Sequence, residues 1–153
     1  MASKFKKVQV THSPTKAIQL LAKIAKEMNG PGTVKVGLPK DSNNYPDGTS
    51  VIMVGTVHEF GSPSRGIPER SYLRSTIEEN KVAYKAFLAK LGKDILTGDL
   101  GANKAMNILG LKVSTDVKDK ITDLKEPALK NREGNPLIDT GHLRQSITYV
   151  VNE

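Results

Sequence analysis

Hydrophobic residues recur every three or four positions in three stretches of the chain, which is the spacing of one face of an α-helix. The first stretch follows Ser13-Pro14, an N-cap residue and a proline suited to the first helical position, and ends at Asn29-Gly30. The second begins at Pro68 and is broken by Thr97-Gly98-Asp99, and the third ends before Pro127. Their apolar positions are Ile18, Leu21, Ala25 and Met28; Leu73, Ile77, Tyr84, Leu88, Leu91 and Ile95; and Ala102, Met106, Leu109, Val113, Val117, Ile121 and Leu124. The pattern predicts one shorter and two long amphipathic helices.

A period of two residues predicts strands elsewhere. Val34, Val36 and Leu38 alternate with Lys35 and Gly37, and residues 146–151 (SITYVV) are rich in β-branched side chains, so we expect these two segments to pair. A shorter candidate strand contains Val8 and Val10. Residues 51–57 (VIMVGTV) are also β-branched in character, and propensity alone predicts a third strand there.

These elements predict an α+β fold in which a small antiparallel sheet is packed by two long helices and shorter ones. Turn-forming residues dominate 40–50 (KDSNNYPDGTS) and 127–136 (PALKNREGNP), which we interpret as flexible surface loops. No internal repeat or linker divides the chain, and 153 residues are enough for one core, so residues 1–153 are expected to form a single domain.

Composition narrows the functional classes. The chain has no cysteine, which excludes disulfides, thiolate zinc sites and cysteine nucleophiles. The basic residues 1–7 are not followed by an apolar segment, and no apolar run approaches the ~18 residues of a membrane span, so we expect neither a signal peptide nor a membrane protein. The net charge of +7 would attract nucleic acid or acidic proteins, although the lysines are scattered rather than clustered.

Two groups of residues invite a catalytic or metal-binding interpretation. His58-Glu59 begins like a zinc-protease signature, but the second histidine would stand at position 62, which is Ser62. Asp139, Thr140 and His142 are too close in sequence to form a catalytic triad, and we interpret Asp139 as the N-cap of a short helix through Leu143 and Arg144. A small hydrolase using His58, Glu59 or Asp139 is a remaining alternative. We predict no catalytic, cofactor or metal site.

The three arginines Arg65, Arg70 and Arg74 offer a different kind of site. Arg70 and Arg74 are four residues apart, which would place them on one helical face, and Arg65 precedes them in a loop. Guanidinium groups bind phosphates and interfacial carboxylates equally well. Aromatic residues make up only 5% of the chain, so base stacking on DNA is less expected than an interface with another protein.

Two segments, "VHEFGSPSRGIPERSYLRSTIEEN" (57–80) and "PLIDTGHLRQSITYVV" (136–151), each contain a short motif. The first has a Glu-Phe-Gly loop followed by a proline-arginine-aromatic-leucine-arginine helix start, and the second has Asp-Thr-Gly-x-Leu-x-x-Ser-Ile. Together they resemble a family of tailed-bacteriophage neck and tail-completion proteins. Ser71 and Tyr72 depart from the common proline and phenylalanine. The matching residues are Glu59, Phe60, Gly61, Pro68, Arg70, Tyr72, Leu73, Arg74, Asp139, Thr140, Gly141, Leu143, Ser146 and Ile147.

The resemblance implies that residues 50–60 form a helix despite their β-branched composition. It also implies a structural protein of the virion, present in the host cytoplasm during assembly, that forms a ring of commonly six copies and joins the tail to the head connector. Its partners would be its own copies and neighbouring neck and tail proteins, with passive contact to DNA in the channel. The interface candidates are Glu59, Phe60, Arg65, Arg70, Tyr72 and Arg74. A tail-terminator ring protein and a basic DNA-binding protein are the alternatives.

Overall fold

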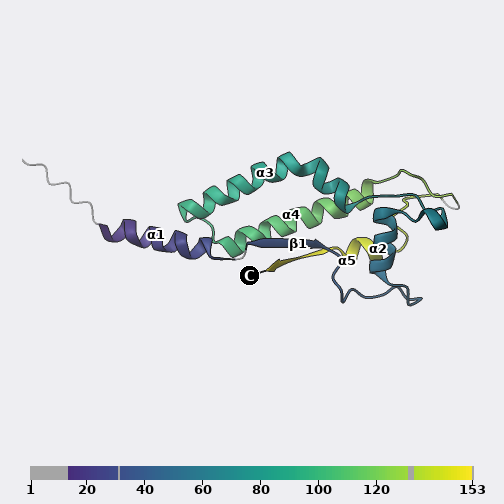
Figure 1. Cartoon of the computed structure of the whole chain (residues 1–153), viewed down its shortest axis with the longest axis horizontal. Coiled ribbons are helices and arrows are strands. Elements are labelled where there is room, and N and C mark those ends of the chain that lie inside the picture. The colour runs from purple at the N-terminus through teal and green to yellow at the C-terminus, as the bar shows by residue number, and fades with distance from the viewer. Residues whose placement is uncertain (1–13, 31, 131–132, 153) are drawn as a thin grey trace, which may run out of the picture.

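A computed structural model describes residues 14–30, 32–130 and 133–152. The candidate strand at Val8 and Val10 and the candidate N-cap Ser13 lie outside these residues, as does His12. The molecule is elongated, with α1 at one end and α2 near the other (Figure 1). Its elements are α1 (Pro14–Met28), β1 (Thr33–Gly37), α2 (Val51–Phe60), the 3-10 turn η1 (Pro63–Arg65), α3 (Leu73–Thr97), α4 (Ala102–Asp123), α5 (His142–Ser146) and β2 (Thr148–Asn152). The α+β prediction is confirmed.

The sheet contains two antiparallel strands, and α4 packs against both (Figure 1). As predicted, the Val34 segment pairs with the C-terminal segment: Val34 lies opposite Val151, and Val36 opposite Tyr149. Gly110 of α4 allows this packing, because a Cβ atom there would lie 2.6 Å from Cγ of Tyr149. Two strands alone are marginally stable, so α4 supplies the apolar surface that the sheet requires.

The two long helices form the predicted hairpin, and α3 packs on α4 (Figure 1). Gly98 takes the left-handed conformation (φ 81°) that ends α3. The Tyr84 hydroxyl donates to Asp116 Oδ2 across the hairpin at 2.9 Å. The predicted apolar face of α3 is only partly correct, because Ile77 and Leu88 are about two-fifths exposed whereas Thr76 is buried. The helix contacts its neighbours along a narrower stripe than the sequence suggests.

Residues 51–60 form a helix, so the strand predicted from propensity is wrong and the expectation from the family resemblance is confirmed here. The Met53 N–H donates to Ser50 Oγ at 3.5 Å, which caps the first turn. Val51 is fully buried in a core that α2, α4, α5 and residue 137 share. Tertiary packing on that core overrides the β propensity of the isolated segment.

Candidate functional site

The Glu59 side chain, at the C-terminal end of α2, caps the N-terminus of α3. Its carboxylate accepts hydrogen bonds from the backbone N–H groups of Tyr72, Leu73 and Arg74, each at 2.9 Å, and from the Ser71 hydroxyl at 2.8 Å. These N–H groups have no partner within their own helix, and a negative charge is favoured at a helix N-terminus. Glu59 therefore joins two helices by one buried carboxylate.

The ionised form of Glu59 is the stable one. Burial raises the pKa of its carboxyl group, but the N–H groups of Leu73 and Arg74 and the Ser71 hydroxyl together outweigh burial and lower the pKa below its ordinary value. The Arg74 guanidinium adds an ion pair to the Glu59 carboxylate at 3.0 Å and a second to Glu69 at 2.8 Å. It also lies 4.6 Å from the centre of the Phe60 ring. Arg74 is thus held in place although half of its side chain is exposed.

Gly61 turns the chain away from α2. Its φ of 71° is left-handed, and a Cβ atom there would lie 2.9 Å from the backbone nitrogen of Glu69. The following loop is closed by two backbone hydrogen bonds between Ser62 and Ile67, at 2.8 and 3.0 Å. Arg65 is exposed in this loop, and it forms no ion pair with any residue that the structure describes.

Arg70 occupies a different place from the one predicted. Its side chain is buried, with Nε donating to the Pro127 carbonyl at 2.6 Å and Nη2 to the Ala128 carbonyl at 3.0 Å. The backbone N–H of Arg70 donates to the carbonyl of His58 at 2.7 Å, which holds the irregular segment before α3 against the end of α2. Helix α3 begins instead at Leu73, so Arg70 and Arg74 do not share a helical face.

The interface candidates consequently divide into two groups. Glu59, Arg70 and Tyr72 are buried in the folded chain, and the expectation that Arg70 is exposed is wrong. They satisfy polar groups or fill the core, because the irregular segment between α2 and α3 has backbone donors that need partners. Phe60, Arg65 and Arg74 lie on the surface and stay candidates.

The C-terminal motif places α5 against α2. Leu143 is buried, and one of its methyl carbons would lie 3.3 Å from a Cβ atom at Gly55. The N-cap of α5 is Gly141 (φ 78°), so the prediction that Asp139 caps this helix is wrong. The Thr140 hydroxyl accepts from the N–H of His142 at 3.4 Å, and the Ser146 hydroxyl donates to the His142 carbonyl at 2.9 Å. Helix α5 therefore begins two residues later than expected, because Gly141 takes the left-handed conformation at its N-cap.

A recess of about 280 Å³ lies between α2 and the loop of residues 40–50. Tyr45, Asp47, His58 and Asp139 contribute its polar groups, and Val54 and Leu143 part of its apolar wall. Nδ1 of His58 is buried with no hydrogen-bond partner in the described structure. Burial, together with the positive charge of Arg70, lowers the pKa of His58, so its imidazole is neutral at pH 7. We did not predict Tyr45 or Asp47, since a turn-rich sequence does not reveal what it packs against.

The residues that resembled a triad are not arranged as one. The ring of His142 lies 4.8 Å from the ring of Tyr45, and its Nε2 is 2.7 Å from the Asn43 carbonyl, so this imidazole holds the loop of residues 40–50. Within residues 14–30, 32–130 and 133–152, no three His, Asp or Glu side chains are grouped closely enough to bind a metal ion. The same ranges contain no helix with the length and apolar character of a membrane span.

Comparisons with protein-family models, with curated proteins and with solved structures find no match to this chain.

Proposed function

We propose that the chain is a ring-forming structural subunit of a tailed-bacteriophage virion, a tail-completion or neck protein that joins the tail to the head connector. Copies of the chain and the adjacent neck and tail proteins are its partners. It acts by binding, and the proposal assigns it no reaction.

The observation that carries the proposal is the meeting of the two motifs that resemble the phage family. They are separated in sequence by α3 and α4, yet helices α2 and α5 are in contact at one end of the molecule. Glu59 and Gly61 of the first motif form the junction between α2 and α3, and Leu143 of the second packs beside Gly55. Such roles give a physical reason for these residue types at these positions, which supports the resemblance.

The arrangement of the arginines favours a protein interface over DNA binding. Arg70 donates to two carbonyl groups inside the molecule, and Arg74 is paired with Glu59 and Glu69. Neutralising several phosphates would require several accessible cations on one surface. Duplex-DNA affinity that is high and falls steeply with salt would instead support the DNA-binding alternative.

Removal of the gene from the phage that carries it tests the proposed function. We expect filled heads and separate tails to accumulate, and purified protein to restore infectious particles when added to the two. Labelled protein should appear as a ring at the junction between head and tail. Infectious particles formed normally without the gene, or particles that lack the protein, would overturn the proposal. Label at the last ring of the tail tube before head joining would assign the tail-terminator role.

A further inference from the structure

The loop that follows α2 forms an open groove of about 440 Å³. Its apolar walls are the Phe60 ring and three residues of the loop, Pro63, Ile67 and Pro68. Phe60 is 59% exposed, so its ring is accessible to a partner rather than part of the core. A recess of this size accommodates a few side chains of a bound molecule. We call these four residues the Phe60 groove.

The walls of the Phe60 groove are fixed within the folded chain. Two backbone hydrogen bonds between Ser62 and Ile67, at 2.8 and 3.0 Å, close the loop, and its prolines restrict the backbone further. The Arg74 guanidinium lies 4.6 Å from the centre of the Phe60 ring and holds the ring in place. Because little conformational freedom remains to be lost on binding, such a surface is suited to recognition.

Two exposed cations border the Phe60 groove. Arg65 belongs to the loop itself, and Lys130 lines the groove from the segment after α4. Arg70 holds that segment in place, because its guanidinium donates to two carbonyl groups shortly before Lys130. Neither Arg65 nor Lys130 is ion-paired within the described parts of the chain. Glu69, the carboxylate that lines the groove, is already paired with Arg74.

This combination of walls and charges selects one kind of ligand. The apolar walls favour an apolar side chain, and the two unpaired cations favour carboxylates on either side of it. Duplex DNA offers phosphates but no apolar side chain that would fill the groove, and two cations neutralise few phosphates. A protein segment with both features matches the groove better than a nucleic acid does.

A second copy of this chain matches the groove less well than an acidic protein. Three exposed apolar side chains outside the groove have lysine neighbours: Val82 and Leu96 lie three residues from Lys85 and Lys93 on α3, and Val150 lies opposite Lys35 in the sheet. Docking these side chains in the groove would bring the lysines close to Arg65 and Lys130, and like charges repel. The net charge of +7 likewise favours an acidic partner over a second copy.

We propose that the Phe60 groove binds an acidic segment of a different protein, in which an apolar side chain flanked by carboxylates enters the groove. The apolar side chain packs against Phe60 and Ile67, and the carboxylates pair with Arg65 and Lys130. The inference rests on the proposed function only in placing this partner among the neighbouring neck and tail proteins.

Binding of synthetic peptides to the purified chain tests the inference. The probe is a fluorescently labelled peptide of sequence Glu-Glu-Leu-Phe-Glu-Glu, followed by fluorescence anisotropy. One matched peptide has lysine in place of each glutamate, and another has alanine in place of the leucine and phenylalanine. We expect saturable binding of the acidic probe with a Kd below about 1 mM, and much weaker binding of both matched peptides.

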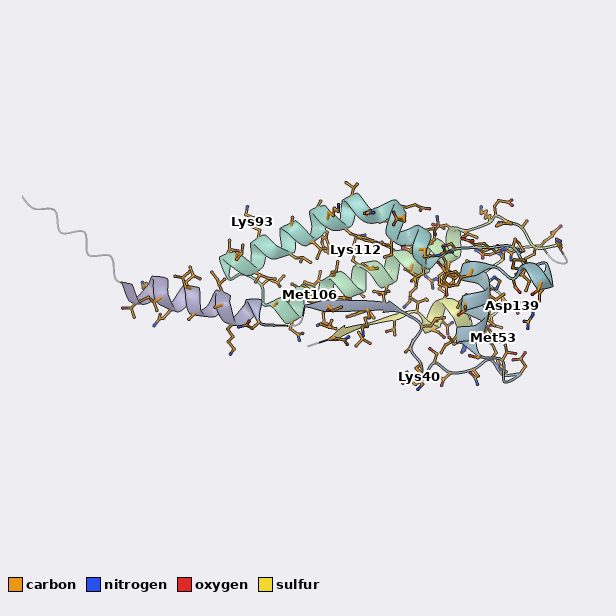
Figure 2. The ribbon with its side chains drawn as sticks, in the orientation of Figure 1. Lys40, Met53, Lys93, Met106, Lys112 and Asp139 are labelled. Carbon is orange, nitrogen blue, oxygen red and sulfur yellow. The ribbon has the colours of Figure 1, made fainter. Side chains whose placement is uncertain are left out.

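Variants of the chain locate the binding site. Phe60→Ala should weaken binding of the acidic peptide by about tenfold or more, and Arg65→Glu and Lys130→Glu by about threefold or more at low salt. The control is Lys93→Glu, which makes the same charge change at an exposed site on α3 and should leave binding nearly unchanged. Figure 2 shows Lys93 at the end of the hairpin that is remote from α2. Urea unfolding of each variant verifies that the fold is retained.

Four results would overturn the inference. The first is the absence of saturable binding of the acidic peptide below about 1 mM, and the second is a loss of binding in Lys93→Glu as large as in Arg65→Glu. Duplex DNA that binds more tightly than the peptide and is lost in Arg65→Glu would assign the groove to nucleic acid. Self-association of the wild type that is lost in Arg65→Glu would assign it to a second copy.

The peptide measurements and the particle experiments fail independently. Absence of peptide binding, with labelled rings still present at the junction of head and tail, would refute the groove assignment alone. Peptide binding by the Phe60 groove, with infectious particles formed normally without the gene, would refute the proposed function alone.

Discussion

Replacement of Glu59 by alanine should destabilise the folded chain more than any other single change at the junction of α2 and α3. The substitution removes the acceptor for the N–H groups of Tyr72, Leu73 and Arg74 and for the Ser71 hydroxyl. It also removes the buried one of the two carboxylates that pair with the Arg74 guanidinium. The three backbone donors stay close to buried residues, so water cannot take the place of the carboxylate acceptor at all of them.

The size of the effect follows from these contacts. An unsatisfied buried donor costs about 1–3 kcal/mol, and the first turn of α3 is partly exposed, so the lower part of that range applies to each of the three. The sum, about 3–5 kcal/mol, equals the usual cost of removing one partner from a buried ion pair. Since whole domains of this kind are stable by about 5–15 kcal/mol, the variant would lose a large part of its free energy of unfolding.

Glu69→Ala is the matched control. Glu69 also binds the Arg74 guanidinium, at 2.8 Å, but its side chain is 54% exposed and accepts no hydrogen bond from the α3 backbone among the described residues. An exposed pair of this type contributes about 0–1 kcal/mol. Urea unfolding at pH 7, read as a change in midpoint at constant slope, gives both values. Equal losses in the two variants would refute the conclusion that Glu59 acts through the N-terminus of α3.

Three further predictions use the same unfolding assay. Gly110→Ala should destabilise the fold by about 1–2 kcal/mol, because the new methyl group meets the Tyr149 ring. Gly92→Ala, whose Cβ meets nothing, should stabilise the fold by about 0.5–1 kcal/mol. A higher unfolding free energy in both variants would contradict the packing of α4 on the sheet. Arg70→Met should cost about 2–4 kcal/mol by removing two charge-assisted hydrogen bonds, and an unchanged midpoint would contradict its internal role. The folded-state pKa values of His58 and Glu59 are both lowered, so the free energy of unfolding should decrease as the pH is lowered through two ranges. The first lies below about 6.5, where His58 of the unfolded chain takes up a proton, and the second below about 4.5, where Glu59 of the unfolded chain does so. His58→Gln should remove the first of these ranges.

The regular elements could be predicted from sequence wherever one periodic pattern and its end signals agree. The end of α3 at Gly98 and the pairing of Val34 with Val151 follow directly from glycine geometry and β-branched alternation. The strand predicted for residues 51–57 failed because propensity describes a segment in isolation, whereas Val51 is placed in a core made by α4 and α5. The start of α3 was misplaced by five residues, because Pro68 favours a helix start locally but the Glu59 carboxylate caps the N–H groups of Tyr72, Leu73 and Arg74.

The candidate site was harder to predict because side-chain polarity does not determine exposure. Glu59 and Arg70 are charged and so were expected at a surface, yet each is the internal partner of backbone groups that the segment between α2 and α3 leaves unpaired. Leu21 was expected on the apolar face of its helix and Phe60 at an interface, and both are among the most exposed apolar side chains of the described residues. The strongly constrained residues of this motif therefore form the internal scaffold of the region, and the exposed apolar side chains lie beside them.

That distinction bears on how the chain would assemble. The junction made by Glu59 and Gly61 fixes the orientation of α2 relative to α3, and Lys23 and Glu27 fix α1 relative to the same hairpin. The exposed apolar side chains of α1 (Ile18 and Leu21) and of α2 (Met53 and Phe60) are consequently held in a defined arrangement by polar contacts within one subunit. In a heterologous assembly this geometry sets the rotation between neighbours and hence whether the ring closes. If the chain forms the proposed ring, sedimentation of variants that weaken Glu59 or Glu27 should show a broader distribution of oligomer sizes than the wild type.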